Sequence, residues 1–216
     1  AAAVQQQPGV QALPLAADVA DPAQVAQAMA AIDQRWGGVD LLVNNAGVGM
    51  RGQVGALDLE SSRRAFDINF WGALTCIEAV LPGMRARRDG LIINISSIIG
   101  RRALPGNSIY CASKFALNAL SESLRVEARA HNVRVVSFYP GVTVTAFLRN
   151  ELSGDSSGQS RGIMPVVSAE VVGRAIVRAA QREPRSAYAT LFDRGLVLAA
   201  AHFPTLVDWA LGRMSR

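Results

Sequence analysis

The sequence predicts an α/β protein with a doubly wound parallel sheet, built as one domain over residues 1–216. Short apolar runs that suit buried strands alternate with longer stretches of helical spacing along the chain. Half of the residues are apolar, which is enough for the core of one domain of this length. Three of the apolar runs end in small or polar residues, at the carboxyl edge where such sheets hold ligands.

The N-terminal part predicts a strand, a helix and a second strand. Residues 9–16 are a short apolar run, and Pro22–Trp36 has helical spacing with Asp21 as the expected N-cap. Residues 39–43 are almost all apolar, which is typical of a strand buried on both faces of a parallel sheet.

The alternation continues to the C-terminus. Helices are predicted over residues 59–84, 108–130 and 168–182, and strands over Gly90–Ile95, 133–138 and 185–190. Residues 148–165 are polar and rich in Gly and Ser, and we expect a substrate lid there, with a disordered surface loop as the alternative. Residues 196–214 are amphipathic and are open to three interpretations: a cap on the core, a subunit contact, or a peripheral membrane contact.

Composition excludes several classes of protein. The net charge is +5, but the arginines are scattered and are not interleaved with stacking aromatics, so we expect no nucleic-acid partner. Cys76 and Cys111 are too few for a disulfide framework, and with two histidines they lack the spacing of metal ligands. No apolar run reaches the roughly 18 residues of a membrane span. We expect a cytoplasmic protein without a metal.

One lysine stands among the basic residues. Of the 22 Lys and Arg residues, 21 are Arg, and the only Lys is Lys114. A lone Lys in such a chain indicates a position where a planar guanidinium cannot replace a compact ammonium. Tyr110 precedes it by one helical turn, so both side chains lie on the same helix face. An adjacent ammonium favours the phenolate and brings the tyrosine pKa, ordinarily about 10, toward the range of a working acid or base.

Polar side chains near the ends of three predicted strands should meet this pair. Ser97 follows the strand Gly90–Ile95, where its hydroxyl can hydrogen-bond a substrate oxygen that gains charge. Asn44, Asn45 and Gly47 end the preceding strand. Pro140, Gly141 and Thr145 follow the next one. The sequence therefore predicts one crevice at the carboxyl edge of the sheet.

These residues, Asn44-Asn45-Ala46-Gly47, Ser97 with Tyr110-x-x-x-Lys114, and Pro140-Gly141 with Thr145, resemble the motifs of the short-chain dehydrogenase/reductase family. Their order and spacing match along nearly the whole chain. The resemblance implies a Rossmann-like fold and an NAD(P)-dependent oxidoreductase, which moves a hydride between nicotinamide and a carbonyl or secondary alcohol. It also implies a homodimer or homotetramer, because the family commonly assembles through its two long helices, here around residues 59–84 and 108–130.

The resemblance implies a role for each catalytic residue. Tyr110 gives a proton to the carbonyl oxygen during reduction, or takes it from the alcohol during oxidation, and Ser97 holds that oxygen. Lys114 lowers the pKa of Tyr110 and hydrogen-bonds the nicotinamide ribose. Asn69 anchors a water in the proton relay to Lys114.

The resemblance also implies a set of cofactor contacts. Asp18, with Val19, matches the position that contacts the adenine ring. Asn45, Ala46 and Gly47 shape the floor under the adenine-side ribose, where small residues allow close backbone approach. The segment that grips the nicotinamide carboxamide and the pyrophosphate is matched by Pro140, Gly141, Val142, Thr143 and Thr145. Ser96 and Cys111 are interpreted as packing residues.

The family's first strand, its glycine-rich phosphate turn, the following helix and the second strand should precede residue 1, so the chain is expected to be N-terminally truncated. The choice between NAD and NADP belongs to that segment, and the implied cofactor is therefore NAD or NADP. In the family's strand order, 3-2-1-4-5-6-7, the strand near residues 10–15 would lose its neighbours. We therefore expect the chain alone to be poorly stable and to bind cofactor weakly.

The expected partner is a small carbonyl or alcohol, and the apolar C-terminal stretch favours a lipid-like or steroid-like one. One alternative is a 3-ketoacyl-thioester reductase of lipid metabolism, whose acidic carrier would meet Arg101 and Arg102. Another is a non-catalytic protein that senses dinucleotide. Intact Tyr110 and Lys114 favour an enzyme over such a sensor.

Overall fold

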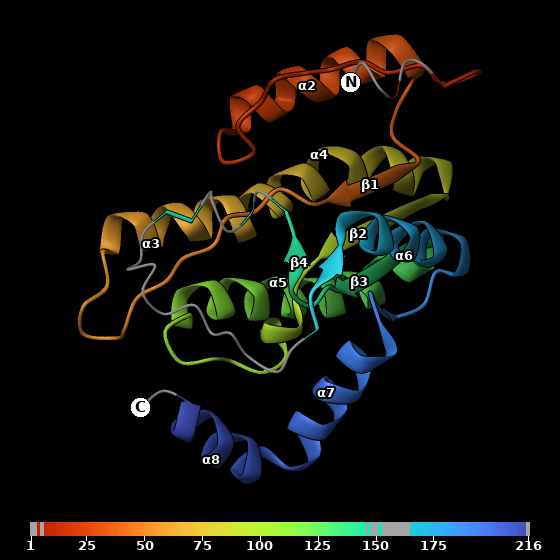
Figure 1. Ribbon diagram of the computed structural model, residues 1–216. Coiled ribbons are helices and arrows are strands. Elements are labelled where there is room, and N and C mark those ends of the chain that lie inside the picture. Colours follow the sequence, from red (N-terminus) through yellow and green to blue (C-terminus); the bar gives the residue numbers. More distant parts are fainter. Residues whose placement is uncertain (1–3, 5–6, 146, 148–150, 153–164, 215–216) are drawn as a thin grey trace.

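The computed structural model describes residues 4, 7–145, 147, 151–152 and 165–214, which form a parallel sheet with helices on both faces (Figure 1). The main sheet has the order β1-β2-β3-β6, and every neighbouring pair is parallel. These strands are β1 (Leu41–Asn44), β2 (Gly90–Ile95), β3 (Val133–Tyr139) and β6 (Ser186–Tyr188). The predicted α/β class with a parallel sheet is confirmed.

The helices follow the predicted alternation with the strands. They are α2 (Pro22–Trp36), α3 (Leu59–Phe66), α4 (Gly72–Arg87), α5 (Ser108–Ala128), α6 (Ala169–Arg182), α7 (Leu191–His202) and α8 (Pro204–Met214). A second, small parallel sheet pairs β4 (Thr143–Val144) with β5 (Val167–Ser168). Asp21 caps α2 as expected, because its carboxylate accepts from the backbone N–H groups of Ala23 and Gln24.

The central strand β2 is buried along its whole length, as its run of mostly apolar residues predicts. Ile92 points to the layer of α4 and α5, where it packs with Ile77 and Leu124. Its neighbours Leu91 and Ile93 point to the opposite face, which α6 covers. The sheet therefore has one apolar core on each side, and its carboxyl edge carries the polar residues.

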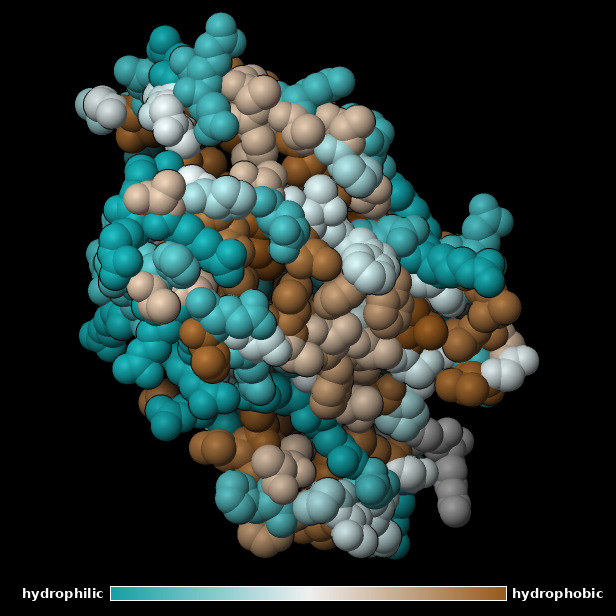
Figure 2. All heavy atoms as spheres, turned by 180° about the vertical axis from the view of Figure 1, so that it is seen from behind, coloured by the Kyte–Doolittle hydropathy of each residue, from teal (hydrophilic) through white to brown (hydrophobic). Residues whose placement is uncertain are grey.

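The strand predicted over residues 9–16 is wrong. The described residues of this segment form no strand, and Val10, Leu13 and Leu15 are each about 40 % exposed. The alternation of apolar residues suits a strand, but no other strand of the described chain pairs with it. Accordingly, β1 is an edge strand, with Leu41 44 % exposed. Seen from behind, apolar atoms are visible between α2 and the rest of the molecule (Figure 2).

The helix predicted over residues 59–84 is continuous but not uniform. Between α3 and α4 it widens into the π-helical segment η1 (Asp67–Trp71), and it runs past Gly83 to Arg87. It ends where Arg88 takes a left-handed conformation, φ 53°, and donates its backbone N–H to the carbonyl of Arg85. A π-helical turn inside an α-helix is rare and is frequent at functional sites.

The amphipathic stretch predicted over residues 196–214 is two helices. Helix α7 already begins at Leu191, where Thr190 and Asp193 form a capping box. No single helix in the described part of the chain is long and apolar enough to cross a membrane. Most of the predicted lid over residues 148–165 lies outside the described residues, which include only residues 151, 152 and 165 of it.

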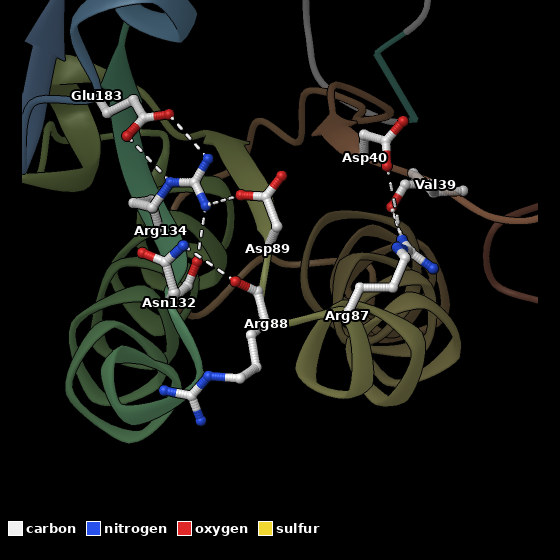
Figure 3. A network of polar contacts seen from close by, with 8 residues as sticks. All are labelled: Val39, Asp40, Arg87, Arg88, Asp89, Asn132, Arg134 and Glu183. Carbon is white, nitrogen blue, oxygen red and sulfur yellow. Dashed lines mark hydrogen bonds and ion pairs between the residues drawn. The ribbon is translucent and has the colours of Figure 1, made fainter.

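Arg134 ties together three turns at the amino edge of the sheet (Figure 3). Its guanidinium binds both carboxylate oxygens of Glu183, at 3.0 and 3.1 Å, and also bonds Asp89 and the carbonyl of Asn132. Glu183 and Asn132 both have left-handed backbones, with φ of 47° and 54°. The network therefore holds two strained turns in place.

We expect Arg134→Met to lower the free energy of unfolding by about 1–2 kcal/mol, because several charge-assisted hydrogen bonds are lost from a side chain that is partly solvent-screened. Urea denaturation measures the change. Arg178→Met is the matched control, since Arg178 is exposed on α6 and has no ion pair among the described residues. Equal midpoints for the two variants would contradict a stabilising role of the network.

Candidate active site

The carboxyl ends of β1, β2 and β3 lie at one edge of the sheet, as predicted. Backbone hydrogen bonds join the segments that follow β2 and β3. The N–H of Ser96 donates to the carbonyl of Phe138 at 2.8 Å, and the N–H of Ile98 donates to Pro140 at 3.1 Å. Ser97, between these two contacts, caps the short 3₁₀ helix η2 (Ile98–Gly100), and its hydroxyl accepts from the N–H of Ile99 at 3.3 Å.

Tyr110 and Lys114 face this edge from α5, and both are buried. The Lys114 ammonium donates to the carbonyl of Ile95, the last residue of β2, at 3.0 Å. It lies 5.8 Å from the centre of the Tyr110 ring. Tyr110 hydrogen-bonds Ser97, so the three predicted side chains lie together.

Burial controls the protonation of both groups. It raises the pKa of Tyr110 to about 12, although the hydrogen bond with Ser97 acts in the opposite direction. Burial also lowers the pKa of Lys114 to about 8. At neutral pH, therefore, Tyr110 is a neutral phenol that has a proton to donate. The expected lowering of its pKa by Lys114 is not seen: burial dominates the pKa of Tyr110, and Ser97 is the group that lowers it.

Asn69 lies in the π-helical segment η1 and is 1 % exposed. Its amide oxygen accepts from the N–H of Val48 at 2.8 Å, and its amide nitrogen donates to the carbonyl of Val48 at 2.9 Å. The same nitrogen donates to the hydroxyl of Ser113 on α5, at 3.1 Å. Asn69 therefore fixes the loop after β1 against the helix that carries Tyr110.

Gly47 lies where this loop meets Lys114. A Cβ atom added there would stand 3.0 Å from the amide oxygen of Asn69 and 3.4 Å from the Lys114 ammonium nitrogen. The ammonium has three donors, and its one protein acceptor among the described residues is the carbonyl of Ile95. A buried cation with donors to spare, beside a glycine that brings no side chain, fits the hydroxyl groups of a cofactor ribose.

The segment after β3 packs against α7 at Gly141. Thr143 donates its hydroxyl to the carbonyl of Gly141 at 3.2 Å, and Val142 accepts from the N–H of Val167 through its carbonyl, at 3.0 Å. Thr145 is exposed and accepts from the N–H of Phe147 at 3.2 Å. A Cβ added to Gly141 would stand 2.2 Å from a carboxylate oxygen of Asp193.

We expect Gly141→Ala to cost about 1–3 kcal/mol of stability, because the new methyl overlaps the buried carboxylate of Asp193. Thermal unfolding of Gly141→Ala, Asp193→Ala and the double variant measures the overlap. The double variant should be more stable than the sum of the two single changes predicts. If the changes in the free energy of unfolding were additive, the methyl group at position 141 would be accommodated by movements that do not involve Asp193.

The family described as short chain dehydrogenase matches residues 1–155, which is most of the chain. This chain is a short-chain dehydrogenase/reductase. The resemblance stated from the motifs is thereby confirmed.

Curated relatives of this short-chain dehydrogenase/reductase carry related descriptions. Human retinol dehydrogenase 8 is 40 % identical over 148 residues, which cover 68 % of this chain and 47 % of the relative. An uncharacterized oxidoreductase of Myxococcus xanthus is 37 % identical over 171 residues, 79 % of this chain and 66 % of its own length. The chain spans about half the length of the curated relatives it matches first.

A solved structure supports the Rossmann-like fold. The short chain dehydrogenase of Burkholderia cenocepacia, solved in complex with NADP, superposes with a TM-score of 0.77 at 27 % identity. The superposition covers 95 % of this chain and 81 % of that one. Levodione reductase superposes with a TM-score of 0.66 at 29 % identity, over 69 % of this chain and 58 % of its own.

In this short-chain dehydrogenase/reductase, the residues predicted to contact the adenine side of the cofactor include Asp18 and Val19, which lie beside α3 and α4. Asp18 is ion-paired with Arg64 of α3, and the hydrogen bond from that guanidinium holds the pKa of the carboxyl below its ordinary value. Val19 packs against Gly72, where a side chain would overlap it. Together with Asn44 and Ala46, Val19 lines a small cavity at the end of β1. Asn45 follows β1 and is exposed.

Sequence reasoning missed a buried polar chain under the site. Asn44 donates to Asn94 at 2.8 Å, Asn94 donates to Ser121 at 2.8 Å, and Ser121 donates to the carbonyl of Leu117. It also missed Asp193, which supports Gly141. Asn94 stands alone among apolar residues in the strand GLIINI, and that break in the run was the available signal. Ser96 and Cys111 are buried, as expected of packing residues.

Proposed function

We propose that the protein is an NAD(P)-dependent oxidoreductase that transfers a hydride between the nicotinamide and a carbonyl or secondary alcohol. The observation that carries this proposal is the buried cluster of Tyr110, Ser97 and Lys114 at the carboxyl edge of the sheet. Membership of the short-chain dehydrogenase/reductase family supports it.

The bound nicotinamide supplies or accepts the hydride. Tyr110, a neutral phenol in this site, gives its proton to the substrate oxygen during reduction, and Ser97 donates a hydrogen bond to the same oxygen as it gains charge. Lys114 remains protonated below pH about 8 and stabilises the phenolate that Tyr110 leaves. Asn69 keeps the loop after β1 in place and holds the position from which the family relays protons to the lysine.

The cofactor is NAD or NADP. Lys114 and Tyr110 would hold the nicotinamide ribose. The remaining contacts are assigned to Asp18, Val19, Asn45, Ala46, Gly47, Pro140, Gly141, Val142, Thr143 and Thr145. The spare donors of the Lys114 ammonium, and the absence of a side chain at Gly47 beside it, support this assignment. The NADP named in the Burkholderia cenocepacia complex is consistent with it.

The substrate is an apolar carbonyl or secondary alcohol. Tyr110 belongs to an apolar cluster with Met50 and Ala65, against which Phe147 and Leu152 pack. The Phe147 ring lies edge-on to the Tyr110 ring, with 5.6 Å between ring centres. A lipid-like or steroid-like substrate would exchange water for these contacts. The name of the relative retinol dehydrogenase 8, which refers to an apolar alcohol, points the same way.

An assay decides the reaction and the substrate class together. The protein, expressed from its complete gene, is mixed with NADH or NADPH and a panel of ketones, aldehydes and ketoacyl thioesters, and nicotinamide absorbance is followed. We expect turnover that favours the more apolar ketones. Cofactor binding without turnover on the whole panel would contradict the proposal and favour a dinucleotide sensor.

The ketoacyl-thioester alternative receives no support from the basic rim. Arg101 is paired with Glu122 and lies over the Tyr139 ring, and Arg102 is paired with Asp208. Their charges are therefore largely satisfied within the protein and are poorly placed to attract an acidic carrier.

The proposed assembly is a homodimer or homotetramer in the cytoplasm. The groove between α4 and α5 has a volume of about 250 Å³ and supports this assembly, because the family pairs these helices. It is lined by Leu74, Ile77, Glu78, Leu81, Pro82, Arg85, Leu120, Ser123, Leu124 and Glu127. The two cysteines are free and buried, as suits a reducing compartment.

We expect Ser123→Arg to convert the assembly into a smaller one, because a long charged side chain would fill the α4–α5 groove. Light scattering coupled to gel filtration measures the mass. Gln34→Arg, on the exposed side of α2, adds the same charge away from the groove and should leave the mass unchanged. An unchanged mass for Ser123→Arg would place the subunit contact elsewhere.

A further inference from the structure

The helices α7 and α8 form an elbow at the lower end of the molecule in Figure 1, and they are bent by 108° relative to each other. One face of α7 is fixed to the body. Val197 is buried against Ile98 and Tyr139, and the carboxylate of Asp193 fills the space beside Gly141. The α7–α8 elbow is therefore attached to two segments of the proposed active site.

The α7–α8 elbow exposes several large apolar side chains, where a helix of a water-exposed surface is normally polar. The five residues that define this surface are Leu191, Leu198, Phe203, Leu206 and Trp209, with exposures of 85, 47, 62, 62 and 56 %. Apolar atoms lie among polar ones at the lower end of the molecule in Figure 2 as well. Five exposed large apolar side chains on two consecutive helices and at the junction between them indicate an interaction surface.

The length and bend of the elbow determine how such a surface can be used. The two helices satisfy the length and composition of a membrane span only as a pair, and the 108° bend prevents them from acting as one straight rod. Each helix alone is too short to cross a bilayer of about 30 Å. A helix that exposes apolar side chains and is too short to span a bilayer can instead lie in the plane of its interface, with those side chains among the acyl chains.

The charges on the elbow identify the partner. Both acidic side chains of the elbow have partners among the described residues: Asp193 is hydrogen-bonded in the capping box, and Asp208 is ion-paired with Arg102. Exposed cations remain: Arg194 lies on α7, and Arg213 stacks on Trp209 with 3.9 Å between its guanidinium carbon and the ring centre. An arginine and a tryptophan together suit the headgroup level of a bilayer.

We propose that the α7–α8 elbow docks the protein on the surface of an anionic lipid bilayer. A second copy of the chain fits this surface less well, because a symmetric contact would bring Arg194 and Arg213 toward like charges on a chain of net charge +5. The same charges favour anionic headgroups by about 1 kcal/mol for each arginine near the surface.

Vesicle flotation tests the docking. The protein should float with phosphatidylcholine vesicles that contain phosphatidylglycerol, and much less with phosphatidylcholine alone. The double change Leu206→Glu and Trp209→Glu should weaken binding by about 100-fold or more, because two apolar anchors become charges. Val177→Glu is the matched control, since Val177 is 56 % exposed on α6, and it should bind like the native protein. Arg213→Gln should weaken binding by about fivefold.

A second measurement does not depend on charge changes. In a Trp36→Phe and Trp71→Phe background, the fluorescence of Trp209 should be quenched by brominated lipid. Absence of flotation, or equal loss of binding in Val177→Glu and the elbow variant, would overturn the proposal. The proposal would also be overturned if the native protein were a dimer, the elbow variant were a monomer, and neither bound to vesicles. None of these readouts needs turnover, so an inactive protein that floats would contradict only the oxidoreductase proposal.

Discussion

Replacement of Tyr110 by Phe is expected to lower kcat by about 10²–10⁴-fold. The phenol hydroxyl hydrogen-bonds Ser97 at the carboxyl edge of the sheet, and burial keeps it protonated with a pKa of about 12. Phe keeps the ring that packs edge-on against Phe147 and removes only the proton donor. Stopped-flow absorbance of the nicotinamide measures the rate, and cofactor fluorescence measures whether binding survives.

Tyr139→Phe is the matched control for this change. Tyr139 is also a buried tyrosine, but its hydroxyl has no hydrogen-bond partner among the described residues. Its removal should leave kcat unchanged and should raise the free energy of unfolding by roughly 1 kcal/mol, since an unsatisfied buried polar group is destabilising. If Tyr110→Phe retained the native rate, another group would have to supply the proton, and the assignment would fail.

The strands of the sheet were predictable where burial alone decides them. The run Gly90–Ile95 is apolar except for Asn94, and it forms the fully buried strand β2 with the predicted bounds. Residues 9–16 show why the same pattern fails elsewhere. A strand also needs a hydrogen-bonding neighbour, and a local pattern does not reveal whether one is present. The break between α7 and α8 was missed although Pro204, the first residue of α8, is a sequence signal for it.

The candidate catalytic cluster was predictable because the spacing of its members in the sequence brings them together. Tyr110 and Lys114 share a helix face, and Ser97 follows a strand, so topology alone brings them together. The supporting residues were not predictable in this way. Asp193 reaches Gly141 across more than 50 positions of the chain, and the packing of α7 decides that contact. The π-helical segment that carries Asn69 has no sequence pattern that distinguishes it from an α-helix.

Lys114 should be irreplaceable for activity in a way that charge alone does not explain. We expect both Lys114→Arg and Lys114→Met to lower kcat/KM by at least about 100-fold. The ammonium nitrogen lies 3.4 Å from the place that a Cβ on Gly47 would take, so the planar guanidinium has no room without moving the loop after β1. In the native enzyme, the reduction rate should fall above pH about 8, as the ammonium loses its proton.

Lys114 should also make the free energy of unfolding depend on pH. Its pKa falls from 10.5 in the unfolded chain to about 8 in the folded protein, because burial disfavours the charged form. Between these two values the unfolded chain binds more protons than the folded one, so the contribution of Lys114 to stability rises with pH across this window. Relative to Lys114→Met, the native protein should therefore gain stability as the pH rises from about 8 to about 10.5.

Urea denaturation of the native protein and Lys114→Met at several pH values measures this difference. Tyr110 titrates in both proteins at higher pH, so its effect cancels in the comparison to a first approximation. A pH-independent difference would mean that the ammonium is solvated in the folded protein. In that case burial would not be what tunes Lys114, and its role beside Tyr110 would rest on charge at a hydrated surface, where the interaction with the phenolate is much weaker.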